Sequence, residues 1–598
     1  MYDKTTTTSG LLDGSAFDAR DLVSLLRQRG ERQAERLAYT FLTDGETAEE
    51  SLTYGELDER ARAVGAMLQG RGLGGERVLL LYPPGLEYVT AFWGCLYAGA
   101  VAVPVYPPRQ NQSLRRLEAV AADAQAKAAL TAAQYLSRKD SADGDSPVLS
   151  RLSWLTAAGG GSAGEWRPPV ISADTPAFLQ YTSGSTAEPK GVMLSHGNLL
   201  HNERMIREAF RQTEQSVIVG WLPLYHDMGL IGNVLQAAYV GARCVLMSPV
   251  SFLQDPARWL AAITRYKATT SGGPNFAYDL CARKIPAARR ESLDLSSWAV
   301  AFNGAEPIRH DTLERFAAAF APCGFRREAF FPCYGLAEAT LFVAGDFKAG
   351  PPVVRAVEPQ ALELGRVADA PHDDASAVKL VGSGRAADGQ RVLVVNPETL
   401  RPCAAEEVGE IWVSGPSVAR GYWNRPEESE HTFGAYLADG GGGPYLRTGD
   451  LGFLEDGELF VTGRLKDLII VRGRNYYPQD IERTVEESHG GLRPGCGAAF
   501  SVELDGEERL VVVQETERHP KADPAEMIGA IRQAVADAHE VQVYAVALVR
   551  LGAVPKTSSG KLRRGECRAK FLSGQLGAVS EWRAGAARTG DAASAPTR

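Results

Sequence analysis

The chain has 598 residues, which at about 150 residues per domain allows several independent hydrophobic cores. Hydrophobic residues make up 44% and charged residues 23% of the chain, so a mostly disordered or collagen-like protein is excluded. The 64 Lys and Arg against 73 Asp and Glu give a net charge of −9, and we therefore expect no nucleic-acid partner.

From about residue 50 to 430 the sequence alternates short β-rich runs with helical periodicity, which predicts an α/β fold with parallel-rich sheets sandwiched by helices. Residues 53–56 (TYGE) form a capping box ahead of a helix that continues through residue 68, and residues 78–82 form an apolar strand. The uncharged stretch 88–108 is about as long as a membrane span, but two glycines and a proline interrupt it. This pattern favours a buried βαβ unit, so no stable membrane insertion is expected.

A loop rich in hydroxyl groups and glycine follows the apolar run 177–179. Such a loop offers backbone N–H and hydroxyl donors to the phosphates of a nucleotide. The residues concerned are Thr182, Ser183, Gly184, Ser185, Thr186 and the cation Lys190. The loop is not a Walker A motif, because Lys190 precedes Gly191 and Val192 rather than Ser or Thr. On its own, a run of this composition is more often an ordinary surface loop.

The pattern changes after about residue 465. A helix over 478–487, a hairpin of strands 498–504 and 509–515, and a helix that starts at Asp523 and continues to about 539 indicate a small α+β domain. We therefore divide the chain into a large domain (1–465), a small domain (466–580) and an unstructured tail (581–598) rich in Ala, Gly, Ser and Thr.

The eight cysteines lie singly along the sequence, with no Cys-x-x-Cys pair. This distribution predicts reduced thiols and no zinc site. Residues 1–10 lack a basic region followed by an apolar one, so we expect no export signal and a cytoplasmic location.

Several further segments, in a fixed order, resemble the motifs of the adenylate-forming (acyl-activating) superfamily over roughly residues 20 to 570. The phosphate loop resembles the family signature, and the segment 302–307 (FNGAEP) resembles the strand end that contacts adenine. The resemblance assigns nucleotide binding to Asn303, Gly304, Ala305, Glu306, Tyr334 and Gly335. It further implies that Tyr334 stacks on adenine, that Glu338 helps to hold Mg²⁺, and that Asp450 binds the ribose hydroxyls.

The resemblance also covers the junction between the two domains. Arg464 matches a residue on the nucleotide side of the family's hinge region, and Lys466 lies near the position about which the small domain rotates. The segment 555–561 (PKTSSGK) matches the family's C-terminal catalytic loop, so Lys561 is its catalytic lysine. A cation there can align a substrate carboxylate and neutralise charge at the α-phosphate. Taken singly, each of these residues has an ordinary structural explanation, such as a turn acid or a surface lysine.

Three features resemble one branch of the superfamily, the fatty acyl-AMP ligases. They are the segments 221–230 and 103–108, the Gly-Arg-Asn sequence at 473–475, and a long connection over roughly 347–381. In that branch the connection is an insertion that packs against the small domain and disfavours CoA thioesters. Its alternative explanation is a tolerated surface loop. His226 matches a position near the acyl carboxylate and phosphate, although it could equally be a hydrogen-bonded core residue.

The resemblance implies a two-step reaction. A fatty acid and ATP, with Mg²⁺, give acyl-AMP and pyrophosphate, and the acyl group then passes to the phosphopantetheine thiol of a holo acyl carrier protein. The alternatives left open are a fatty acyl-CoA synthetase, an amino-acid-activating domain and a catalytically silent nucleotide-binding protein. The apolar residues between 226 and 241 suit an acyl tunnel and a hydrophobic core equally well.

Overall fold

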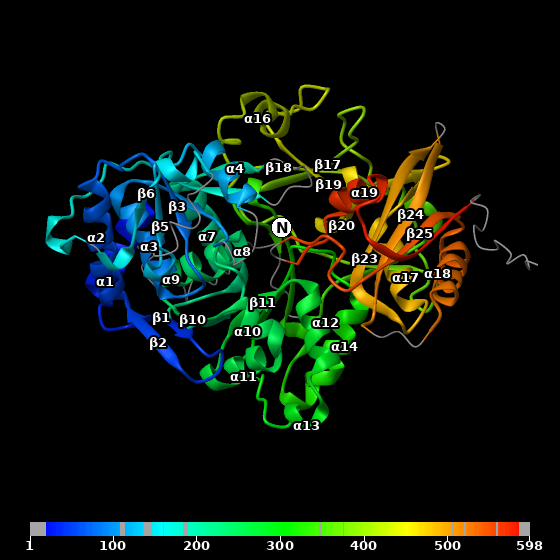
Figure 1. Cartoon of the computed structure of the whole chain (residues 1–598), viewed down its shortest axis with the longest axis horizontal. Coiled ribbons are helices and arrows are strands. Elements are labelled where there is room, and N and C mark those ends of the chain that lie inside the picture. Colours follow the sequence, from blue (N-terminus) through cyan, green and yellow to red (C-terminus); the bar gives the residue numbers. More distant parts are fainter. Residues whose placement is uncertain are drawn as a thin grey trace, which may run out of the picture.

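The computed structural model describes residues 19–107, 114–136, 146–159, 161–182, 189–345, 350–374, 376–504, 507–518, 522–557 and 560–584. They form a large lobe and, at its side, a smaller lobe made of the C-terminal strands and helices (Figure 1).

Two mostly parallel sheets build the centre of the large lobe. The six strands of the first are, in spatial order, β6 (Ser153–Leu155), β5 (Ala128–Thr131), β3 (Arg77–Leu81), β4 (Val101–Pro104), β7 (Pro176–Thr182) and β8 (Lys190–Ser195). The eight strands of the second are β14 (Phe342–Gly345), β13 (Phe330–Gly335), β12 (Val300–Asn303), β11 (Thr270–Gly273), β9 (Val217–Gly220), β10 (Arg243–Met247), β1 (Leu37–Leu42) and β2 (Glu49–Thr53). Only the pairs β7–β8, β13–β14 and β1–β2 in these two sheets are antiparallel.

Helices cover and separate the sheets, as the alternating sequence pattern predicts. The main ones are α1 (Leu22–Arg32), α2 (Tyr54–Gln69), α3 (Leu86–Ala98), α4 (Arg115–Asp123), α7 (His196–Phe210), α11 (Ala257–Tyr266), α12 (Asn275–Lys284) and α14 (His310–Phe320). Helix α2 begins at the predicted capping box, in which Thr53 and Glu56 each accept a hydrogen bond from the other's backbone N–H. The uncharged stretch folds as α3 and β4 inside the core, and none of the described helices is long and apolar enough to cross a membrane.

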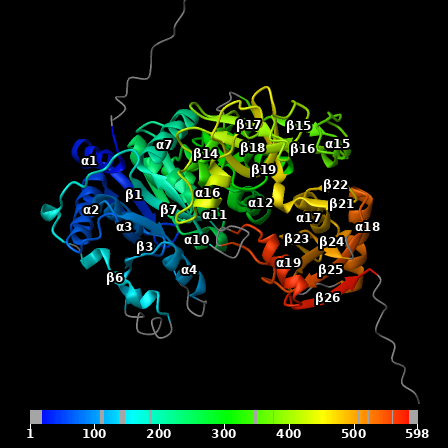
Figure 2. The ribbon, with the colours of Figure 1, turned by 90° about the horizontal axis from the view of Figure 1, so that it is seen from above.

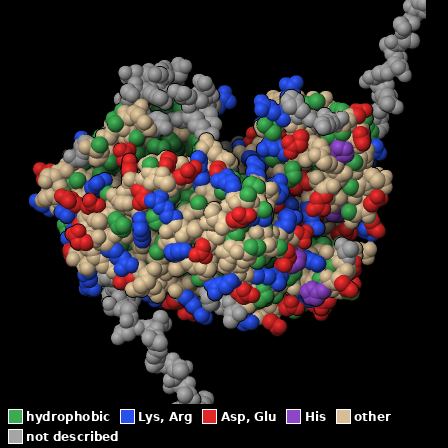
Figure 3. Space-filling model, turned by 90° about the horizontal axis from the view of Figure 1, so that it is seen from below, with side chains coloured by type: hydrophobic (Ala, Val, Ile, Leu, Met, Phe, Trp, Pro, Cys, Tyr) green, Lys and Arg blue, Asp and Glu red, His purple; other side chains and the backbone are tan. Residues whose placement is uncertain are grey.

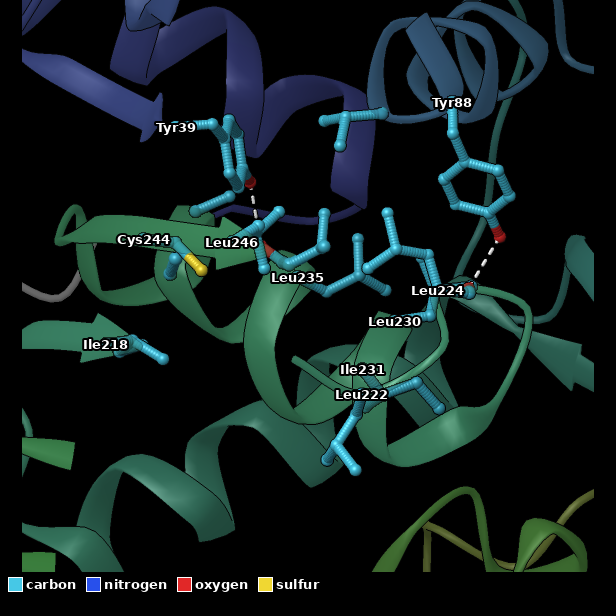
Figure 4. Packing of buried hydrophobic residues seen from close by; sticks show 14 of the residues in the cluster. Tyr39, Tyr88, Ile218, Leu222, Leu224, Leu230, Ile231, Leu235, Cys244 and Leu246 are labelled. Carbon is cyan, nitrogen blue, oxygen red and sulfur yellow. Dashed lines mark hydrogen bonds between the residues drawn. The ribbon is translucent and has the colours of Figure 1, made fainter. Parts of the chain in front are cut away.

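The segment that follows His226 joins the core of the large lobe. It contains one turn of α-helix, α8 (Asp227–Gly229), and then a π-helical stretch, η4 (Leu230–Leu235). Leu230, Ile231 and Leu235 are fully buried in the same hydrophobic cluster as strands β1, β9 and β10 (Figure 4). Tyr39 donates a hydrogen bond to the Val234 carbonyl across this cluster at 2.7 Å. These apolar residues therefore act as core.

An antiparallel sheet links the large lobe to the small one. Its strands are β17 (Arg391–Val395), β18 (Gly409–Ser414), β19 (Leu446–Glu455) and β20 (Glu458–Arg464). Strand β20 ends at Arg464, and the turn η8 (Leu465–Asp467) leads into the small domain.

The small domain is a four-stranded sheet with helices on both faces. It contains β21 (Ile469–Val471), β22 (Arg474–Tyr476), α17 (Pro478–Glu487), β23 (Leu492–Leu504), β24 (Glu507–Thr516), α18 (Pro524–His539), β25 (Val543–Val549), α19 (Arg564–Leu572) and β26 (Ala578–Arg583). Alternate residues of β24 face opposite clusters: Leu510 and Val512 pack with α17 and α18, whereas Val511 and Val513 pack with α19.

The ordered chain continues past the predicted start of the tail. We expected the tail to begin at residue 581, but Glu581, Trp582 and Arg583 pair with β25 as the end of β26. The aromatic ring of Trp582 packs against the small-domain core, with the Arg532 guanidinium 3.6 Å from its centroid. The composition of residues 581–598 concealed this strand, because one apolar side chain and the backbone hydrogen bonds are enough to hold an edge strand.

The two domains meet through ion pairs as well as through the chain. Arg309, just before α14, lies 3.9 Å from Glu486 of α17, and Asp311 lies 3.4 Å from Arg483. The inserted segment contributes β15 (Val354–Val357), α15 (Pro359–Glu363) and β16 (Val378–Val381), which lie above β21 and β22 (Figure 2). There Glu363 lies 3.4 Å from Arg474.

Candidate active site

The predicted nucleotide residues meet at the carboxyl ends of the parallel strands of the eight-stranded sheet. Strands β9, β11, β12 and β13 end at Gly220, Gly273, Asn303 and Gly335. Ligands of open α/β sheets bind at this edge, where loops diverge and leave space. A Cβ on Gly335 would lie 1.8 Å from the Leu341 carbonyl oxygen, so the backbone can turn here only because residue 335 is glycine.

Asn303 is a buried polar residue at this edge of the sheet. Its side chain is fully buried, and neither amide atom has a hydrogen-bond partner among the described residues. Such a group normally costs 1–3 kcal/mol, about the loss expected for one missing hydrogen bond. Next to it, Gly304 allows close contact with the Cys333 carbonyl oxygen, since a Cβ there would approach to 2.8 Å. This edge therefore offers both amide donors and acceptors to a heterocyclic base.

Ala305 and Glu306 turn toward a helix. Ala305 has a φ of +70°, which is uncommon for a residue other than glycine. This conformation allows the Glu306 carboxylate to accept a hydrogen bond from the Phe276 N–H at the start of α12, at 2.5 Å. Burial raises the pKa of Glu306, and this N–H and Lys561 oppose the increase. The observed role of Glu306 is thus to cap a helix beside the site.

Tyr334, Asp450 and Arg464 form a connected triad. The Tyr334 hydroxyl donates to Asp450 Oδ2 at 2.8 Å, and Arg464 Nε lies 3.0 Å from Asp450 Oδ1. Asp450 and Arg464 face each other because they are register partners in β19 and β20. Asp450 raises the pKa of the Arg464 guanidinium, while burial and then Asp450 raise the pKa of Tyr334. The arrangement holds one carboxylate, 7% exposed, at the edge of the site.

Glu338 lies in the short turn η7 (Ala337–Ala339) and accepts a hydrogen bond from the Tyr422 hydroxyl at 2.9 Å. The described residues contain no group of three His, Cys, Asp or Glu side chains that could enclose a metal ion. A single carboxylate suits Mg²⁺, which usually binds one or two protein carboxylates, several waters and the phosphates of a substrate. Tyr422 is a site residue that the sequence did not indicate, because 84 residues separate it from Glu338.

Only the two ends of the phosphate loop are described. Thr182 closes β7 and pairs with Lys190 at the start of β8, so the ends of the loop are held together. The Lys190 ammonium forms an ion pair with Glu428 and lies 5.3 Å from the centre of the Tyr422 ring. Ser183, Gly184, Ser185 and Thr186 lie outside the described residues.

His226 precedes α8 and is neutral at pH 7. Burial lowers its pKa to about 4, with Asp227 opposing the decrease and Lys561 and Arg116 adding to it. Its Nε2 atom is buried and without a hydrogen-bond partner in the described part of the chain. His226 therefore belongs to the site, and its neutral ring can bind a polar group of a ligand.

Lys561 reaches this edge from the small domain. Burial lowers its pKa and Arg464 adds to the decrease, whereas Asp227, Glu306 and Asp450 oppose it. These groups belong to the large domain, so the lysine stands among residues from several of the predicted motifs. Its backbone is fixed by a turn in which Thr557 N–H donates to the Lys561 carbonyl at 2.8 Å. Lys466 lies in η8, and burial followed by Arg464 lowers its pKa.

The insertion packs against the junction of the two domains. Val357, Leu362 and Val367 form one buried cluster with Phe453 of β19 and Tyr477. Because Tyr477 immediately precedes α17, the insertion and the small domain share an apolar contact as well as the Glu363–Arg474 ion pair.

Comparison with known proteins identifies the family. The family model for AMP-binding enzymes matches residues 26–423, more than half of the chain, and a model described as "Disco-interacting protein 2-like, AMP domain" matches residues 466–581. A medium-chain-fatty-acid–[acyl-carrier-protein] ligase from Moorena producens is 51% identical over 573 residues, covering 94% of this chain and 96% of the relative. The crystal structure of a fatty acid AMP ligase from Legionella pneumophila is 43% identical, with a TM-score of 0.75, and covers 96% of this chain and 99% of that one.

The chain belongs to the fatty acyl-AMP ligase branch of the AMP-binding enzymes. A second structure of this branch, a fatty acyl-adenylate ligase from L. pneumophila in complex with acyl adenylate and pyrophosphate, is 42% identical with a TM-score of 0.74. It covers 95% of this chain and 98% of that one. The predicted fold class and family of this fatty acyl-AMP ligase are thus confirmed.

Proposed function

We propose that the protein activates a fatty acid with ATP to acyl-AMP, releases pyrophosphate, and transfers the acyl group to the phosphopantetheine thiol of an acyl carrier protein in the cytoplasm. The observation that carries the proposal is the group of Tyr334, Asp450 and Arg464 joined through the Asp450 carboxylate, and that carboxylate also opposes the lowering of the pKa of Lys561 from the small domain. The relatives named above support the fatty acid, the adenylate and the carrier protein as substrates and partner.

In the first step a fatty carboxylate oxygen attacks the α-phosphorus of ATP, and the bond from that phosphorus to pyrophosphate breaks. Lys561 supplies positive charge where negative charge accumulates, and its neighbouring carboxylates favour its protonated form. His226, neutral at pH 7, can donate or accept one hydrogen bond to the reacting carboxylate. No side chain of the protein becomes covalently modified.

The remaining residues position the nucleotide. Asp450 accepts hydrogen bonds from the two ribose hydroxyls, and Tyr334 and Arg464 keep its carboxylate oriented. Asn303 pairs with the base, and Thr182 and Lys190 hold the ends of the phosphate loop. Glu338 would hold Mg²⁺, which neutralises phosphate charge and orients the leaving group. Such positioning supplies most of the catalysis in phosphoryl and nucleotidyl transfer.

In the second step the thiol sulfur attacks the acyl carbonyl and AMP leaves with the electrons of the mixed-anhydride bond. We infer that the small domain rotates about Lys466 for this step, because the carboxylates that influence the pKa of Lys561 belong to the large domain, where the thiol must also reach the adenylate. The contact of the insertion with Tyr477 and Arg474 supports restriction of this rotation and therefore poor use of free CoA.

Mass spectrometry of the products from a panel of fatty acids, ATP and Mg²⁺ tests the proposal. With free CoA we expect acyl-AMP, and with a holo carrier protein we expect the acylated carrier. Lys561→Ala should form acyl-AMP at least about 100-fold more slowly, whereas Lys284→Ala, an exposed lysine at the end of α12, should be unchanged. Abundant acyl-CoA would instead identify a fatty acyl-CoA synthetase, and absence of any adenylate a silent nucleotide-binding protein.

A further inference from the structure

The small domain contains a cavity of about 420 Å³ next to the loop that carries Lys561. It lies between the start of β23, the turn after β25, and α19. A register shift between Leu492 and Gly497 bends β23 away from β24, and Gly495 adopts a φ of +66° there. The irregular strand therefore leaves space that a regular sheet edge would fill.

The walls of this cavity carry an excess of positive charge. Four cations and two carboxylates line it, which leaves a net charge of +2; they are Arg493, Lys556, Arg563, Lys570, Glu515 and Glu566. The side chains of Arg493, Arg563 and Lys570 are 38%, 28% and 37% exposed, so a ligand from solution can reach them.

Carboxylates of the cavity form ion pairs with three of these four cations. Glu515 binds Arg493 at 2.9 Å, and Glu566 binds both Arg563 and, at 3.0 Å, Lys570. The ammonium of Lys556 contacts the Gly495 carbonyl at 2.6 Å and the Cys496 sulfur at 3.3 Å, and neither group is an anion.

Arg563 also has a hydrogen-bond donor that no protein group satisfies within the described residues. Its Nε atom is buried, with no hydrogen-bond partner in the described ranges. Burial and then the positive charge of Arg563 lower the pKa of Arg116 in α4 of the large domain, so Arg116 adds to the positive charge on the side of Arg563 that faces the large domain. Lys and Arg side chains gather along the furrow between the two lobes (Figure 3). Arg and Lys side chains gathered in this way favour the binding of a carboxylate or phosphate group.

We propose that this cavity binds a phosphate group. Lys and Arg side chains that converge in a concave site recognise phosphate oxygens by charge-assisted hydrogen bonds. The inference rests on the proposed function for its two possible sources, the pyrophosphate released in the first step and the phosphodiester of the phosphopantetheine arm in the second. Phosphate bound here contacts Lys556, whose backbone pairs with Leu562 on the other side of the catalytic loop, and so fixes the position of Lys561.

The test is a charge reversal that leaves the catalytic loop intact. Lys570→Glu changes a side chain that is 37% exposed. Its partner Glu566 still forms an ion pair with Arg563 in this variant. Arg568→Glu is the matched control, because it reverses a charge on the same helix at an exposed position outside the cavity. Arg568→Glu should form acyl-AMP at the wild-type rate, and each effect of Lys570→Glu is measured relative to it.

Two ligand comparisons distinguish the sources. If the arm binds here, wild type prefers 4′-phosphopantetheine over pantetheine as acyl acceptor, and Lys570→Glu loses about fivefold of that preference. If pyrophosphate binds here, its inhibition constant for acyl-AMP formation rises about fivefold in Lys570→Glu. Arg568→Glu should change either quantity by less than about twofold. Equal behaviour of both variants in both assays overturns the inference.

A readout without catalysis separates this inference from the proposed function. If pyrophosphate is the ligand, inorganic pyrophosphate should raise the unfolding temperature of wild type and Arg568→Glu more than that of Lys570→Glu. If the phosphopantetheine arm is the ligand, free 4′-phosphopantetheine should produce the same difference. A wild-type chain that makes no acyl-AMP but shows either difference would retain the phosphate site and lose the proposed function. Identical shifts in all three chains, with both ligands, would remove the phosphate site whatever the activity.

Discussion

A partly buried arginine, Arg564, joins the end of the hinge to the small domain, and its removal should destabilise that domain. Arg564 forms two parallel hydrogen bonds to the Glu482 carboxylate, both at 2.7 Å, and a third to Asp467 at 3.2 Å. Glu482 is 4% exposed and also accepts the Ala499 N–H at 3.0 Å. Burial lowers the pKa of Arg564, but Glu482 and Asp467 together outweigh burial, so this pKa is raised.

Arg564→Met keeps the length of the side chain but leaves the Glu482 carboxylate buried without its cation. Removing one partner of a buried ion pair typically costs about 3–5 kcal/mol, because the remaining charge stays desolvated. Since each 1.4 kcal/mol is a factor of ten, amide hydrogens in β24 should exchange on the order of 10² to 10³ times faster if they exchange by unfolding of the small domain. Hydrogen exchange with mass spectrometry measures this locally, where a whole-chain melting curve would mix several domains.

The double variant Arg564→Met/Glu482→Leu tests whether the unpaired Glu482 carboxylate causes the loss of stability. Replacing both charges by apolar groups removes the desolvation cost, so protection of β24 should return to within about tenfold of wild type. Arg568→Met, on the exposed side of the same helix, should change protection by less than about threefold. If Arg564→Met exchanges like Arg568→Met, or if the double variant exchanges faster than the single one, the pair does not stabilise the domain as described.

Three further predictions concern the site and the core. Asp450→Asn should raise the KM for ATP about 10- to 100-fold with unfolding temperature little changed, since it weakens charge-assisted hydrogen bonds; an unchanged KM would remove the ribose role. Lys561 must be protonated, so the rate of acyl-AMP formation should fall as pH rises through its lowered pKa, below the 10.5 of free lysine, and a pH–rate profile of the first step checks this. Burial lowers the pKa of His196 to about 4 from 6.5, so it is neutral when folded and stability should decline by about 3 kcal/mol as pH falls from 6.5 to 4. Denaturant titrations at several pH values should show a smaller decline for His196→Gln, whose amide can still accept the Leu22 N–H.

Local signals in the sequence were enough to predict many elements. The capping box at Thr53 and the proline at the start of α17 are decided by neighbours in the chain, and both helices begin where these residues place them. The parallel sheets followed from alternating patterns, which report burial directly.

Contacts between distant residues were not predictable in the same way. Tyr422 meets Glu338, and Arg564 meets Glu482 and Asp467, only after the sheets and domains have packed. The motif assigns Glu306 to the nucleotide, and the sequence did not indicate that its carboxylate accepts a hydrogen bond from the Phe276 N–H at the start of α12. Sequence motifs can therefore nominate candidate site residues, whereas the hydrogen-bond partners of those residues depend on the tertiary arrangement.

The ion pairs between the two domains have a consequence for measurements on this protein. Arg483 and Asp311 are both about half exposed, so their pair contributes only about 0–1 kcal/mol. In the Arg309–Glu486 pair the carboxylate is largely buried, and burial raises the pKa of Glu486 to about 7, so this carboxyl is only partly ionised at pH 7. The free energy that separates this arrangement from a rotated one is therefore small in its electrostatic part, and added salt reduces it further, since charges are screened over about 8–10 Å at 0.1–0.15 M. Ionic strength is thus a variable of the reaction itself, and rates of the two half-reactions are comparable between laboratories only at matched salt.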